Sequence, residues 1–162
     1  MKWLSVLVIS LIASVSFAQS WKTITSKEAG LTFTVPTNPQ SSTRTDEGIQ
    51  TRMWIASSGN TNFVVSVSFK PSNAPANFDK QMADGIKKGF LNSTNATALS
   101  DKAATYAGIA GREIVFKNAK GVHGSIWIIS KNSKIYTLTV AKQSSAYQAE
   151  QKKFFGSLKL TK

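Results

Sequence analysis

Residues 112–140 read REIVFKNAKGVHGSIWIISKNSKIYTLTV, and this stretch decides the fold. It contains three segments rich in β-branched and aromatic residues, which favour extended backbone. The connections between them are short and carry glycine, asparagine or serine, as the turns of antiparallel hairpins do. The stretch therefore predicts three consecutive strands of an antiparallel meander, at 112–117, 122–130 and 134–140.

Upstream of this meander, apolar and polar residues alternate in shorter segments that predict four more strands. Leu31–Val35 alternates strictly and follows a looser β-prone segment at 21–25. Residues 50–56 and 62–69 are separated by a short polar turn, which predicts a hairpin. The polar stretch 36–48 has no apolar periodicity, so we expect a loop there.

A helix is expected to begin after Asn77, because apolar residues recur every four positions from Phe78 to Phe90. Gly85 and Gly89 lower its helix propensity and suggest that its backbone docks closely on a sheet. The segment that follows, 92–111, is mixed and contains several turn residues.

A second helix is expected near the end of the chain. Ser145 and Gln148 have the spacing of a capping box, and the apolar residues continue to Leu158. Strands, helix, strands and helix follow one another in that order. This order predicts an α+β fold, an antiparallel sheet flanked by helices in a single domain at 19–162.

The first 18 residues have the features of a secretory signal peptide. Met1-Lys2 is followed by an apolar run to Val15, and Ser16 and Ala18 are the small residues that favour cleavage after Ala18. The alternative is an uncleaved anchor, but the apolar run is short for a membrane span. The chain has no cysteine, so a lipid cannot be attached at this junction. We therefore expect a periplasmic or secreted protein whose mature chain has no transmembrane span.

The composition excludes several kinds of chemistry. Without cysteine, disulfides, iron–sulfur clusters and thiolate nucleophiles are excluded, and a single histidine cannot make a multi-histidine metal site. His123 and Ser125 would lie on one face of a strand roughly 6–7 Å apart, too far for a direct nucleophile–base hydrogen bond. Glu113 comes from the neighbouring strand, but the sequence does not fix it beside His123. We therefore expect no enzyme activity, catalytic residue, metal or cofactor.

Charge is the most distinctive feature of this sequence. The full chain has a formal charge of +12, and residues 117–162 contain nine lysines against one acidic residue, Glu150. Such a surface attracts anionic lipid headgroups, polyanionic glycans or acidic proteins. Lysines greatly outnumber the three arginines, which argues against specific nucleic-acid recognition. The candidate anion- or partner-binding residues are Lys117, Lys120, Lys131, Lys134, Lys152 and Lys153. The alternative is that the lysines serve solubility alone.

Five features occur in an order that resembles the PsbP-like group of exported proteins, which includes thylakoid-lumen photosystem proteins and the periplasmic DcrB family. They are Trp21, GLTFTVP at 30–36, GIAGRE at 108–113, KIYTLTV at 134–140 and FFGSLKL at 154–160. The resemblance implies an antiparallel sheet flanked by helices and an accessory role. It implies no catalytic residues, because these features are strand hydrophobes and turn glycines.

Three functional hypotheses follow. The first is an exported, non-enzymatic accessory protein of the bacterial envelope that binds an unknown envelope partner. The second is a binder of polyanions or of an anionic envelope surface through the lysine-rich C-terminal third. The third is a hydrolase that uses His123 with Ser125 or an acidic residue, against which the strand spacing argues.

Overall fold

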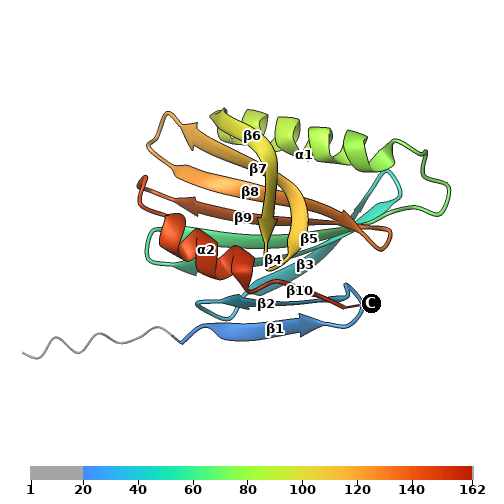
Figure 1. Ribbon diagram of the computed structural model, residues 1–162, viewed down its shortest axis with the longest axis horizontal. Helices are drawn as coiled ribbons and strands as arrows, with labels where there is room; N and C mark the ends of the chain where they lie inside the picture. Colours follow the sequence, from blue (N-terminus) through green and yellow to red (C-terminus); the bar gives the residue numbers. More distant parts are fainter. Residues whose placement is uncertain (1–19, 162) are drawn as a thin grey trace, which may run out of the picture.

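The structure, a computed structural model, describes residues 20–161, so the predicted signal peptide lies outside the described residues. The described chain forms two antiparallel sheets and two helices (Figure 1). From edge to edge, the larger sheet contains β3 (Gln40–Asp46), β4 (Ile49–Ser58), β5 (Thr61–Phe69), β9 (Lys134–Lys142), β8 (His123–Lys131), β7 (Ile109–Asn118) and β6 (Ala96–Tyr106). The smaller sheet contains β1 (Lys22–Ser26), β2 (Leu31–Val35) and β10 (Lys159–Leu160), with β2 in the middle.

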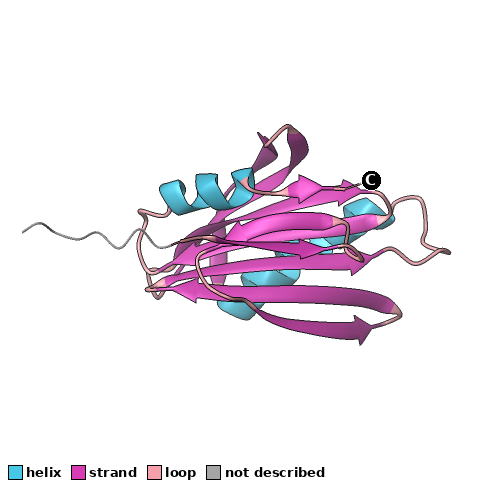
Figure 2. Ribbon diagram, turned by 90° about the horizontal axis from the view of Figure 1, so that it is seen from below, coloured by secondary structure: helices cyan, strands magenta, loops and turns pink. Residues whose placement is uncertain are grey.

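The two helices lie on opposite faces of the larger sheet (Figures 1 and 2). Helix α1 (Phe78–Thr94) covers one face, and helix α2 (Gln148–Gly156) packs on the other face together with the smaller sheet. The expected α+β class, an antiparallel sheet flanked by helices, is therefore confirmed. The sequence pattern did not predict that β1, β2 and β10 would form a second, smaller sheet.

The main core lies between the larger sheet, α2 and the smaller sheet. Its largest fully buried side chains are Phe33, Phe63, Trp127, Tyr136, Phe154 and Phe155. A second apolar cluster lies under α1 and is built on Ile114, Phe116, Ile126 and Ile128. Strands β7 and β8 contribute side chains to both clusters, because successive side chains of a strand point to opposite faces.

Gly124 shows why one position in the meander has no side chain. A Cβ on Gly124 would overlap the carbonyl oxygen of Val140 on β9 and would come within 2.7 Å of Cζ of Phe116. Glycine at this position therefore lets the phenylalanine ring lie across the sheet under α1.

Two strands lie where the sequence predicted loops or turns. β3 occupies most of the predicted loop 36–48, and β6 occupies most of the mixed segment 92–111. Both are edge strands: all seven residues of β3 are exposed, and no residue of β6 is fully buried. A strand with no buried face needs no apolar alternation, which explains why the pattern was missing.

The helix predictions were right in position and partly wrong in detail. Gly85 and Gly89 do not allow a close approach, because a Cβ at either residue would meet nothing within 4 Å. Asn77 lies at the start of α1 without a side-chain capping bond. The Ser145–Gln148 capping box is also absent, since α2 begins at Gln148 with Tyr147 as its cap residue.

Candidate binding surfaces

His123 and Ser125 do not form a nucleophile–base pair. His123 lies at the first position of β8, opposite Lys117 on one side and Lys142 on the other. Ser125 is fully buried, and its hydroxyl shares a 3.2 Å hydrogen bond with the hydroxyl of Tyr147. The register places Glu113 opposite Trp127, so the carboxylate does not lie opposite His123.

Glu113 instead belongs to a buried polar cluster that the sequence analysis did not find. Its carboxylate accepts hydrogen bonds from the hydroxyl of Tyr106, at 3.0 Å, and from the amide of Gln151 on α2. Burial, and then the neighbouring Glu113, raise the pKa of the Tyr106 phenol well above its usual range. These bonds tie β6 and β7 to α2. The only signal in the sequence was an acidic residue at an inward-facing strand position.

The structure divides the six candidate lysines among three places. Lys117 and Lys120 lie at the β7–β8 turn, and Lys131 and Lys134 face each other at the opposite end of β8. These two ends of the strand are roughly 26 Å apart, from eight steps of about 3.3 Å. Lys152 and Lys153 are exposed on α2. The six residues therefore do not form a single patch.

The acidic side chains are mostly used within the fold. Arg112 forms ion pairs with Asp84 on α1, at 2.6 Å, and with Asp101 on β6, at 2.7 Å, and Lys87 also reaches Asp101 at 2.6 Å. Further ion pairs, each between 2.6 and 3.1 Å, are Arg44–Asp46, Arg52–Glu28, Lys70–Asp79, Lys80–Asp84 and Lys142–Glu150. Many lysines therefore remain without an acidic partner in the described chain.

Some of these lysines lie on the same face as four threonines of the neighbouring strands β1 and β2. Thr23 lies opposite Thr34, and Thr25 lies opposite Thr32 with a 3.0 Å bond between their hydroxyl oxygens. Lys159 lies opposite Thr32 on the other side. We call this surface the threonine–lysine face; it comprises Thr23, Thr25, Thr32, Thr34, Lys152, Lys153 and Lys159.

Helix α2 lies next to the threonines of β2 and extends this face. A shallow hollow is lined by Thr34, Ala149, Lys152, Lys153, Gly156 and Ser157. Residues 149, 152, 153 and 156 have the spacing of one helical stripe. One wall of the hollow is therefore the outward side of α2. The ammonium group of Lys153 lies over the ring of Trp21, 4.4 Å from its centroid. The lysines of α2 and the threonines of β2 therefore belong to one continuous surface.

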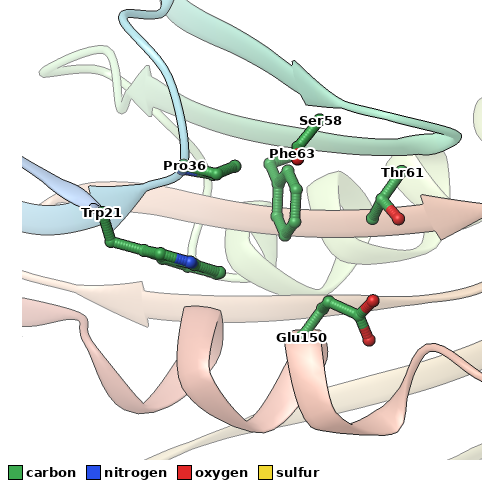
Figure 3. A pocket seen from close by; sticks show the side chains of 6 residues that line it. All are labelled: Trp21, Pro36, Ser58, Thr61, Phe63 and Glu150. Carbon is green, nitrogen blue, oxygen red and sulfur yellow. The ribbon is translucent and has the colours of Figure 1, made fainter. Parts of the chain in front are cut away.

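A small pocket lies beside Trp21 (Figure 3). It has a volume of about 100 Å³ and lies between Trp21, Pro36 and Phe63 on one side and Glu150 on α2 on the other. Pockets for drug-sized ligands measure about 300–1,000 Å³. This pocket is too small to be a strong candidate for such a ligand.

The other candidate surface is a groove between α1 and the β3–β4 hairpin. It consists of two adjoining hollows of about 300 and 230 Å³, and we call it the β3–α1 groove. It is lined by Ser42, Arg44, Asp46, Glu47, Ile49, Thr51, Met53 and Met82. Its floor is apolar, its rim is charged, and its outer wall is the edge strand β3. Ile55, 42% exposed, continues the same face of β4.

Among residues 20–161, no group of three or more histidine, cysteine, aspartate or glutamate residues could hold a metal ion. No helix in this part of the chain is long and apolar enough to cross a membrane.

Comparisons with known proteins identify the fold. No protein-family model and no curated protein matches the chain. The solution structure of the cyanobacterial PsbP protein of Synechocystis matches with a TM-score of 0.61 and 11% identity, over 88% of this chain and 93% of that one. A crystal structure from Bacteroides thetaiotaomicron matches with a TM-score of 0.50 and 15% identity; this chain spans about half its length, and the match covers 87% of this chain and 48% of that one. At these identities the matches establish the fold alone: the chain has a PsbP-like fold.

Proposed function

We propose that the protein is an exported, non-enzymatic accessory protein of the bacterial envelope, and that it binds its partner through the β3–α1 groove. The observation that carries this proposal is the groove itself, where an apolar floor meets an edge strand. An edge strand presents unpaired backbone groups to which an extended segment of a partner can add. The groove beside it offers pockets for the side chains of that segment.

The groove has the composition expected of a binding site. Ile49, Met53 and Met82 supply its apolar contacts, and methionine adapts its shape to different partners. Arg44 and Asp46 form an exposed ion pair of 2.9 Å at the rim, where each can bond to a partner instead. The remaining acidic residue of the rim, Glu47, lies in the β3–β4 turn.

Two further arguments support the non-enzymatic and exported parts of the proposal. The candidate nucleophile Ser125 is buried and bonded to Tyr147 rather than to His123. The first 18 residues have the charge, length and small-residue pattern of a cleaved signal peptide.

The test compares two single substitutions of exposed hydrophobic residues. Ile55→Glu changes the sheet face beside the groove, and Leu99→Glu changes the opposite edge of the sheet, where Leu99 is 51% exposed. Each immobilised protein is exposed to an extract of its own envelope at roughly 150 mM salt, where surface charges more than about 8 Å apart are largely screened.

We expect the wild-type protein and Leu99→Glu to retain one stoichiometric partner, and Ile55→Glu to lose it. Equal retention by Ile55→Glu would place the binding site elsewhere. The absence of any salt-resistant partner from the wild-type eluate would contradict the proposed function.

A further inference from the structure

We propose that the threonine–lysine face docks on an anionic phospholipid surface. This inference rests on the proposed function, because it describes how an envelope accessory protein is held at a membrane while its groove stays accessible. The groove and this face belong to opposite sides of the larger sheet: the groove lies beside α1, and the threonine–lysine face lies beyond α2.

The charge of the face is complementary to such a surface. Lys152, Lys153 and Lys159 are exposed and form no ion pair with any residue of 20–161, and the face as defined contains no acidic residue. The nearest acidic residue along α2, Glu150, is paired with Lys142 at 2.6 Å, so its charge is already offset within the fold. Each lysine near an anionic membrane surface contributes to binding independently of sequence-specific contacts.

The threonines give the face a second means of binding. Thr23, Thr25, Thr32 and Thr34 form two opposed pairs on the outer side of two neighbouring strands. The hydroxyl groups of Thr23 and Thr34 can donate hydrogen bonds to phosphate oxygens, and so can the one hydroxyl of the Thr25–Thr32 pair that does not donate to the other. The strands of this small sheet lie side by side, so that the hydroxyls can meet an extended surface rather than a single ligand (Figure 2).

Two features favour a bilayer over a soluble polyanion. Trp21 lies half-buried at the rim of the face under Lys153, and tryptophan is enriched at membrane–water interfaces. The apolar run that ends at Val15 also precedes Trp21 by only five residues, and β1 follows at Lys22. Until that run is removed, it would hold this side of the domain next to the membrane.

The experiment measures sedimentation of the mature protein with vesicles. One set contains equal parts of phosphatidylglycerol and phosphatidylcholine, and the other contains phosphatidylcholine alone. The test variant is Lys152→Gln/Lys153→Gln/Lys159→Gln. The matched control is Lys117→Gln/Lys120→Gln/Lys131→Gln, which removes the same charge from the two ends of the larger sheet. Soluble polyphosphate is added as a competitor in a third arm.

We expect the wild-type protein to bind the anionic vesicles only. Three lysines, each worth about a fivefold change in affinity, predict a roughly 100-fold loss for the test variant. The control variant should lose less than tenfold, and Thr23→Val/Thr32→Val, which keeps shape and charge, should bind several-fold more weakly than the wild type. Circular dichroism verifies that each variant is folded.

Three results would overturn the inference. These are equal losses in the two lysine variants, equal binding to neutral vesicles, and complete displacement by polyphosphate at charge equivalence with no difference between the threonine variant and the wild type. If vesicles are not bound while a salt-resistant partner is still captured from the envelope extract, this inference fails and the proposed function stands. If neither is bound, both fail.

Discussion

At the scale of single residues, glycines with the same backbone freedom serve different purposes in this fold. Gly124 lies where a side chain would overlap β9 and press on Phe116, whereas Gly89 lies on the open side of α1. The two positions therefore predict opposite responses to the same substitution.

Gly124→Ala should lower the free energy of unfolding by about 1–3 kcal/mol, because overpacking forces backbone or side-chain shifts. Gly89→Ala should raise it by up to about 1 kcal/mol, the difference in helix propensity between the two residues. Urea unfolding followed by circular dichroism measures both. A stable Gly124→Ala protein would show that β8 and β9 can separate locally at no cost.

The buried Glu113 cluster shows the limit of sequence reasoning at this scale. An acidic residue in a strand reads as solvated unless the register and the packing helix are known. Here β6 supplies Tyr106 and α2 supplies Gln151, from segments 7 and 38 residues away in sequence. Only the folded arrangement shows that the carboxylate is bonded.

At the scale of elements, helix α1 is held on the larger sheet by ion pairs as well as by its partly buried apolar side chains. Hydrogen bonds from Arg112 and Lys80 lower the pKa of Asp84 from 3.8 to about 2, and Arg112 holds the pKa of Asp101 lower still. A carboxyl whose pKa is depressed by folding stabilises the protein above its unfolded pKa. This contribution is lost as the pH falls through the folded pKa.

We therefore expect the stability of the wild-type protein to fall between about pH 5 and pH 2. The double variant Asp84→Asn/Asp101→Asn should be less stable at neutral pH and should lose less stability over the same range. Thermal unfolding at several pH values measures the difference. Parallel curves for the two proteins would show that the acid sensitivity arises elsewhere.

The elements that the sequence predicted well are those with at least one buried face. The meander, the β4–β5 hairpin, Leu31–Val35 and both helices were found because their side chains alternate or repeat toward a core. β3, β6 and β10 were not, because an exposed edge strand and a two-residue strand depend on their neighbours for pairing. The β3–α1 groove was missed for the same reason, since one of its walls is β3.

At the scale of the whole molecule, the predicted signal peptide makes a direct prediction. The exported protein should begin at Gln19, because small residues at positions 16 and 18 suit signal peptidase. The mass of the intact protein recovered from an expressing bacterium, measured by mass spectrometry, identifies the cleavage site. Ala18→Asp is the control: it should leave residues 1–18 attached and the protein bound to the membrane. A full-length wild-type product in the cytoplasm would contradict the assignment.

The middle position of β2 has a consequence for the time at which the fold can close. β2 pairs with β1 on one side and with β10 on the other, and the backbone amide of Thr161 donates a 2.9 Å hydrogen bond to the carbonyl of Gly30. Strand β2 thus acquires its second neighbour only from a segment more than 120 residues later in the chain. The smaller sheet cannot be completed before that segment has been made. This late closure would help to keep the chain unfolded while it passes through a narrow translocation channel.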